Sequence, residues 1–219
     1  MIKIFLILIL LSLFSLLVVL LIKEVKEKSY LSDHLISKII EFILDEDITF
    51  GILFMIIMGL DPGLATMGFG VINLERGVYT VIDYGIVSTP KEDTLPVRLS
   101  KIEQGVTTLI ETYKPSQISV EELFFSKNIT TGISVAEARG VMLLTAVKLI
   151  GDEVYEYTPN QIKQAVTGYG GADKIQMQHM VQVLLRLKSV PRPDDAADAL
   201  AVAICHAQTS RMIGTFKVQ

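Results

Sequence analysis

From Met55 onward, segments typical of strands alternate with segments typical of helices, and this order most narrows the folds open to the chain. Three strand-like segments come first, at 55–61, 67–77 and 78–88, and the turn at 75–77 joins the last two as a hairpin. Helical and strand segments then alternate to the end of the pattern. A hairpin followed by alternating elements predicts an α/β domain with a mixed sheet flanked by helices.

The remaining elements give this sheet two more strands and five helices. Apolar periodicity, proline and glycine signals predict strands at 116–125 and 153–159, and helices at 99–113, at 134–150, after Pro159, from about Asp173 and from about Pro193. The sequence therefore predicts a five-stranded mixed sheet, preceded by a separate hydrophobic segment at the amino terminus.

That hydrophobic segment, residues 4–22, is apolar apart from two serines and is long enough to cross a bilayer as a helix. Three lysines follow it in "KEVKEKSY", and only Lys3 and the amino terminus precede it. The excess of positive charge after the span places the rest of the chain in the cytoplasm, tethered to the inner face of the membrane.

The chain thus divides into four predicted regions. These are a transmembrane segment with a basic flank at 1–28, an amphipathic connector at 29–54, the α/β domain at 55–212 and a tail at 213–219. An alternative stays open: because a self-contained pattern begins near Met55, the leader need not belong to the mature protein, which would then be a soluble cytoplasmic protein.

Charge and cysteine content exclude some classes of protein. Residues 1–54 hold five of the 20 basic and seven of the 24 acidic groups, so the rest of the chain carries 15 and 17. This balance gives no general attraction to phosphate, so nucleic-acid binding would need a local patch or metal ions in an acidic pocket. Cys205 is the chain's one cysteine, which excludes an intrachain disulfide.

Acidic side chains stand at the ends of elements that are otherwise apolar. In open α/β sheets such element ends gather at one edge, where binding sites form. Each acid also has a structural explanation, as a turn former or as a helix cap that complements the dipole. The acids are Asp61 after the first strand, Glu121 and Glu122 late in the fourth, and Asp194, Asp195 and Asp198 at the start of the last helix.

Such acids would repel one another in a partly dry site, and divalent cations would remove that repulsion. Asp195 and Asp198 are three residues apart and so share a helix face. Carboxylate sites with open positions suit Mg²⁺ or Mn²⁺, and paired ions about 3.5 to 4 Å apart assist phosphoryl displacement. The pattern therefore predicts a metal site that acts on phosphate esters.

Five sequence blocks carry a resemblance to a known family. "GLDPGLATMGFGVI", "ISVEELFFSKN", "EARGVMLLTAV", "QIKQAVTGYGGADKIQMQHMV" and "DDAADALAVAICH" resemble, in order and spacing, the successive blocks of the RuvC-type Holliday junction resolvases. The first block alone also occurs in actin-like kinases, but the five together are specific. The resemblance spans about residues 55–210.

The resemblance implies an RNase H-like fold, a homodimer, and an endonuclease that resolves four-way DNA junctions in recombination and repair by paired, symmetric nicks. It implies two Mg²⁺ ions per active site, replaceable by Mn²⁺, and hydrolysis that leaves 5′-phosphate and 3′-hydroxyl ends. Branch-migration proteins of the RuvA and RuvB type are the implied partners. The catalytic and metal-binding residues implied are Asp61, Glu121, Asp195 and Asp198, which makes Asp194 a helix cap.

The resemblance also assigns residues to DNA. It implies that Phe124 stacks on DNA and that Lys163 and Lys174 bind the phosphate to be cut. Arg139 either binds DNA or braces its helix, and the sequence leaves both open. The apolar surface of the helix at 134–150 is implied to contribute to the dimer interface.

Other functions stay open from the sequence. The hydrophobic leader favours a membrane-tethered junction-binding protein whose nuclease activity is dispensable. The metal pattern also fits another RNase H-like nuclease. The block "GLDPG" is shared with actin-like phosphotransferases, although the sequence shows no second phosphate loop.

Overall fold

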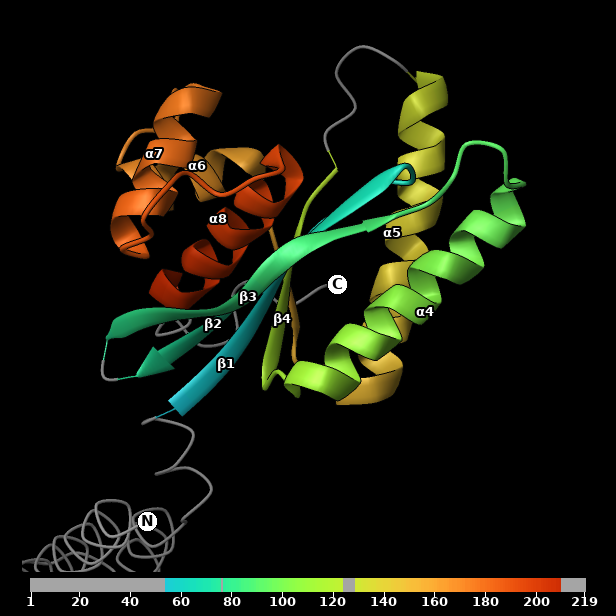
Figure 1. Ribbon diagram of the computed structural model, residues 1–219, viewed down its shortest axis with the longest axis horizontal. Coiled ribbons are helices and arrows are strands. Elements are labelled where there is room, and N and C mark those ends of the chain that lie inside the picture. Colours follow the sequence, from blue (N-terminus) through green and yellow to red (C-terminus); the bar gives the residue numbers. More distant parts are fainter. Residues whose placement is uncertain (1–53, 76, 124–128, 210–219) are drawn as a thin grey trace, which may run out of the picture. The chain divides into compact units, whose positions relative to one another are not determined.

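The computed structural model describes residues 54–75, 77–123 and 129–209, so the predicted membrane segment at 4–22 lies outside it. In the part of the chain that is described, none of the helices combines the length and apolarity that a membrane span requires. The described residues form a five-stranded mixed sheet with helices on both faces, which confirms the predicted fold class (Figure 1).

The sheet has the strand order β3-β2-β1-β4-β5. β1 pairs antiparallel with β2 and parallel with β4, which in turn pairs parallel with β5. The elements are β1 Phe54–Asp61, β2 Thr66–Glu75, β3 Val78–Ser88, α4 Leu95–Tyr113, β4 Gln117–Glu121, α5 Ile129–Ile150, β5 Val154–Tyr157, α6 Pro159–Thr167, α7 Lys174–Leu184 and α8 Asp194–Thr209.

Several bounds differ from the prediction: α4 begins at Leu95 instead of 99 and β5 spans Val154–Tyr157 instead of 153–159, and the differences at β4 and α5 lie next to a candidate acid or are larger. β4 stops at Glu121, short of the expected end at 125, because its partners run out: the register with β1 ends at Val120 and that with β5 at Glu121. α5 begins at Ile129, earlier than the predicted 134. The candidate acid Glu121 is therefore the last residue of β4, and one further backbone bond, from the Glu122 N–H to the Tyr157 carbonyl, follows it.

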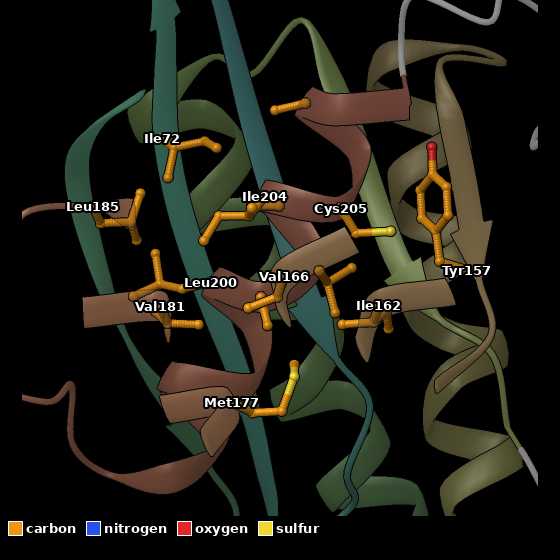
Figure 2. Close-up of a cluster of buried hydrophobic side chains, with 14 of the residues drawn as sticks. Ile72, Tyr157, Ile162, Val166, Met177, Val181, Leu185, Leu200, Ile204 and Cys205 are labelled. Carbon is orange, nitrogen blue, oxygen red and sulfur yellow. The ribbon is translucent and has the colours of Figure 1, made fainter. Parts of the chain in front are cut away.

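Each face of the sheet has its own hydrophobic core, and β1 contributes to both by alternation. Met58 and Leu60 belong to the core that contains the buried residues of α4 and α5. Ile57 belongs to the core on the other face, formed with α6, α7 and α8. Figure 2 shows side chains of this second core, including Val166, Val181 and Leu200, gathered between these helices and the sheet.

Glycines let α8 lie directly on the sheet. A Cβ added to Gly59 would stand 2.1 Å from the carbonyl oxygen of Ala199, and one added to Gly68 would stand 2.0 Å from that of Asp195. Real Cβ atoms do not approach a carbonyl oxygen so closely, so any larger residue would push the helix away. The first turn of α8 is therefore held against the strand ends of β1 and β2.

Candidate active site

Asp61 and Glu121 end two neighbouring parallel strands, so their backbones meet at one edge of the sheet. Gly59, two residues before Asp61, lies against the backbone of α8. Ser119, two residues before Glu121, places its Oγ 3.4 Å from the Val202 carbonyl oxygen of the same helix. Because side chains alternate along a strand, Asp61 and Glu121 lie on the α8 face as well.

The start of α8 brings two more carboxylates to this edge. Asp61 is opposite Gly68 in the pairing of β1 with β2, and Gly68 lies beneath the backbone of Asp195. Asp198 follows three residues later and so lies one helical turn further along the same side. The four predicted acids therefore come from three elements to one place.

The charges of these acids interact. Burial raises the pKa of Asp61 to about 8, and the carboxylates of Glu121, Asp198 and Asp195 contribute to the rise, whereas Lys174 opposes it. Burial also raises the pKa of Glu121 to about 7, with the Asp198 charge adding to the effect and Lys163 lowering it. The pKa of Asp198 is raised by burial despite Lys174. The site thus gathers acids whose charged forms the protein only partly balances, so that Asp61 and Glu121 hold their protons up to about pH 7 to 8.

Two lysines from α6 and α7 face this charge. Lys163 acts on Glu121 electrostatically, and the Lys174 Nζ lies 3.3 Å from an oxygen of both Asp194 and Asp198. Capping boxes fix where the two helices begin: Thr158 with Gln161 for α6, and Asp173 with Gln176 for α7. The sequence pattern of each box thereby sets where its lysine stands.

A pocket of about 250 Å³ opens between these elements. Its lining combines two of the acids with both lysines and apolar side chains of α6, α7 and α8. The lining residues are Glu121, Pro159, Ile162, Lys163, Ala172, Asp173, Lys174, Met177, Asp198 and Ala201. Asp61 and Asp195 are not among them and contribute to the site through their charges.

The chemistry of these side chains fits divalent metal ions. Carboxylate oxygens are the ligands that Mg²⁺ and Mn²⁺ prefer, and a cation would stabilise the charged form of Asp61, which burial and then the neighbouring carboxylates disfavour. Within the described residues, no three Asp, Glu, His or Cys side chains are already gathered as closely as metal ligands. The ammonium of Lys174 is the cation beside Asp198 here, so metal binding would have to draw the acids together.

One expectation from the sequence turns out differently. The resemblance makes Asp194 a cap, but Asp194 is the first residue of α8 and its carboxylate pairs with Lys174 and Arg192.

The sequence leaves two functions open for Arg139, which contacts the Glu121 carbonyl oxygen and the Glu156 carboxylate. Sequence reasoning missed Glu156 as a partner; the signal was the alternation in "EVYEY", which puts it on the opposite face from Tyr157. The predicted DNA contact Phe124 lies outside the described residues.

Comparison with known proteins places the chain in a family. The family model described as "Crossover junction endodeoxyribonuclease RuvC" matches residues 57–206. The RuvC protein of Rubrobacter xylanophilus is 55% identical over 157 residues, which are 72% of this chain and 87% of that protein. The protein of the same name from Clostridioides difficile is 50% identical over 163 residues, 74% of this chain and 96% of that protein.

A solved structure of T. thermophilus RuvC in complex with a Holliday junction substrate is similar in fold as well as in sequence. It superposes with a TM-score of 0.69 and 35% identity, covering 74% of this chain and 98% of that one. The yeast mitochondrial Holliday junction resolvase Ydc2, at 12% identity and a TM-score of 0.53, shares the fold. This chain belongs to the RuvC family of crossover junction endodeoxyribonucleases.

Proposed function

We propose that this chain is a metal-dependent endonuclease that resolves four-way DNA junctions, with Asp61, Glu121, Asp195 and Asp198 as the metal ligands. One observation carries the proposal: four carboxylates from β1, β4 and α8 interact at one sheet edge, beside a pocket that two lysines line. The match covers nearly the whole length of relatives named crossover junction endodeoxyribonuclease, which supports the same activity here.

We propose Mg²⁺ as the metal, in two sites per active centre, with Mn²⁺ as a substitute. Bound divalent ions would supply positive charge at the phosphodiester and acidify a water. The carboxylates of rigid strand ends would hold those ions in place. Lys163 and Lys174 line the pocket as donors for phosphate oxygens. The cut would leave 5′-phosphate and 3′-hydroxyl ends.

We further propose a homodimer, in which two equal sites cut opposed strands of a nearly twofold-symmetric junction. An exposed apolar stripe on α5 supports it: the side chains of Ile133, Leu144 and Val147 are 54%, 57% and 46% exposed. These residues recur at spacings that keep them on one side of the helix. Recruitment by proteins of the RuvA and RuvB type, and a cytoplasmic location, stay predictions.

The test uses isosteric changes in neighbouring acids. Asp195→Asn and Glu121→Gln should lower cleavage of a synthetic four-way junction by more than about 100-fold, because each loss of a ligand charge removes several kcal/mol of stabilisation. Binding of the uncut junction in Ca²⁺ should persist. Glu122→Gln is the matched control and should cut normally. The Glu122 backbone bonds to Tyr157 on β5, and its carboxylate is not one of the four proposed metal ligands. Undiminished cutting by Asp195→Asn or Glu121→Gln would remove that residue from the mechanism.

A further inference from the structure

We propose that Arg139 is a positioning residue that fixes the end of β4, and with it the carboxylate of Glu121, rather than a contact to DNA. This inference rests on the proposed function, which makes Glu121 a metal ligand. It gives Arg139 a defined part in the reaction without any contact between its guanidinium and the substrate.

Arg139 ties three elements together. Its Nε donates to the carbonyl oxygen of Glu121 at 3.3 Å, and a terminal guanidinium nitrogen pairs with the carboxylate of Glu156 on β5. The Arg139 side chain is 17% exposed and that of Glu156 is 28% exposed. A cation so enclosed and already paired has little capacity left for a phosphate.

Arg139 also approaches from the wrong side to reach the pocket. Val154, two residues before Glu156, belongs to the core with α4 and α5, so alternation puts Glu156 on that face. Tyr157 belongs to the opposite core, with α8. The pocket is lined from β4, α6, α7 and α8, and Arg139 is not among its lining residues.

The backbone at Glu121 needs such a tie because the strand ends there. The N–H of Glu122 donates to the Tyr157 carbonyl at 2.9 Å, and among the described residues this is the final backbone bond from β4 to β5. Arg139 adds a bond from α5 to the carbonyl of the very residue that carries the acid. Metal ligands must be held to about half an ångström, and bonds behind the ligand supply that precision.

An arginine suits this place better than a lysine. Its planar guanidinium presents donors in a fixed fork, so one side chain bonds to the Glu121 carbonyl and to Glu156 together. A lysine would keep the ion pair with Glu156 as a point charge and lose the fixed second bond. Arg139→Lys therefore removes the hydrogen bond to the Glu121 carbonyl and keeps the positive charge beside Glu156.

The experiment measures metal binding and DNA binding separately in the full chain. Arg139→Lys should weaken Mn²⁺ binding without DNA, followed by calorimetry, and lower kcat by about 10- to 100-fold, the range for groups that orient metal ligands. Its KM and its junction affinity in Ca²⁺ should match the wild type. Glu156→Gln should shift Mn²⁺ affinity and kcat in the same direction by less. Combining both changes should cost less than the product of the single effects, because they act through one contact.

A matched control removes a cation from another ion pair. Lys101 of α4 pairs with Asp93 at 2.5 Å and lines no part of the pocket, so Lys101→Gln should leave Mn²⁺ affinity and kcat unchanged. Thermal unfolding of every variant checks that it folds. If Arg139→Lys does not fold, the isosteric Glu156→Gln decides the same question.

Two results would overturn the proposal. If Arg139→Lys kept its Mn²⁺ affinity, and if a charge-removing Arg139→Gln bound junctions more weakly with a shallower salt dependence, Arg139 would be a phosphate contact. If the variants changed neither metal affinity nor kcat, the brace would have no part in the reaction.

Glu121→Gln is measured alongside, so that a failure of the Arg139 proposal can be told apart from a failure of the proposed function. Intact Mn²⁺ binding and cutting in that variant would refute the assignment of Glu121 itself, whatever Arg139→Lys shows.

Discussion

Asp194 and Asp195 are adjacent in the sequence but have different surroundings. The backbone of Asp195 lies on Gly68 beside Asp61, whereas the Asp194 carboxylate pairs with Lys174 and Arg192. Lys174 also contacts Asp198, one of the proposed metal ligands. Asp194 thus competes with a metal ligand for the same ammonium group.

Asp194→Asn should raise the Mg²⁺ concentration needed for half-maximal cleavage by about two- to five-fold, the modest size expected when a solvent-exposed ion pair is lost. The physical reason is that Lys174 would lose one carboxylate and pair more with Asp198. Rate measurements across a Mg²⁺ series check this. Asp93→Asn, which removes an acid from the pair with Lys101, should leave the Mg²⁺ dependence unchanged. A lower Mg²⁺ requirement in Asp194→Asn would contradict the competition.

His206 is the buried polar residue with the clearest consequence for pH. Its Nδ1 lies 2.8 Å from the Tyr157 hydroxyl and its Nε2 lies 2.8 Å from the Gln117 side-chain oxygen. A neutral ring protonated on Nε2 satisfies both, donating to Gln117 and accepting from Tyr157. Burial lowers the pKa of His206 to about 4, with Glu153 opposing the shift.

Because its pKa is lower in the folded than in the unfolded chain, His206 should destabilise the fold in acid. Below about pH 6.5 the unfolded chain binds a proton that the folded chain takes up only near pH 4, so stability is lost as the pH falls through that window. Between pH 7 and 5 the loss amounts to about 2 kcal/mol relative to His206→Gln. Urea unfolding of both proteins at the two pH values measures it.

The comparison with the variant is needed because other groups act in the opposite sense. The raised pKa values of Asp61 and Glu121 mean that the folded chain holds their protons more tightly than the unfolded chain does. Their contribution to stability therefore falls as the pH rises from the ordinary carboxyl range through about 7 to 8. Equal pH slopes for the wild type and His206→Gln would show that His206 does not titrate differently on folding.

Residue types and spacing predicted acids at the ends of elements, but the family resemblance chose Glu121 over Glu122 and Asp195 over Asp194, and neither predicted the pairings of the site. Alternation along β4 distinguishes Glu121 from Glu122 only when it is known that Ser119 faces α8, which is a fact of tertiary packing. In the same way, the roles of Asp194 and Arg139 depend on partners distant in sequence. The cluster of acids was predictable because acids at the ends of sheet elements meet at one edge, where their mutual repulsion calls for a shared cation.

At the scale of elements, the contact of α8 with the sheet decides where two of the acids stand. Backbone atoms of Ala199 and Ala203 occupy the space where a Cβ on Gly59 would lie, at 2.1 and 2.6 Å. Neither atom can move without moving the whole helix. The spacing between Asp61 and the acids of α8 therefore depends on residue 59 having no side chain.

Gly59→Ala should lower the free energy of unfolding by about 3 kcal/mol, near the upper end for overpacking, and should also reduce cleavage in the fraction that stays folded. Denaturant unfolding and kcat at a temperature below the transition measure the two effects. Gly105→Ala is the matched control and should cost less, since the atoms nearest to the new methyl all belong to the side chain of Val87, the first at 2.7 Å, and a side chain can shift more easily than a backbone. An equal cost for both variants would mean that the backbone contact is not special.

Element order and most boundaries were predictable from apolar periodicity and capping residues. The hairpin at β2 and β3 and the start of α7 at its Asp173 cap follow from local sequence. The end of β4 did not, because a strand ends where its neighbours end, and the lengths of β1 and β5 are not written in the sequence of β4. The start of α5 was not predictable either. The apolar periodicity indicates a helix only from 134, whereas α5 begins at Ile129.

At the scale of the whole molecule, the exposed stripe on α5 is an apolar surface that the rest of the described domain leaves uncovered. Leu144, within this stripe, is 57% exposed. In the proposed dimer, a carboxylate at this place would be buried without a partner, which opposes association.

Leu144→Glu should therefore convert the dimer to a monomer at micromolar concentration, as measured by light scattering, and should replace paired cuts with single nicks. Leu149, 44% exposed, lies about 140° around α5 from Leu144, so Leu149→Glu is the matched control and should remain dimeric. A dimer that survived Leu144→Glu would place the interface elsewhere.

The direct contact between α8 and the main chain of the sheet has a consequence for how such a protein would meet its substrate. Where two backbones touch at Gly59 and Gly68, no flexible layer is left to absorb a misfit. Because the acids stand on this rigid contact, the DNA, and not the protein, would have to bend. Selectivity among DNA shapes would then arise from how cheaply each can be distorted until a phosphate reaches the acids.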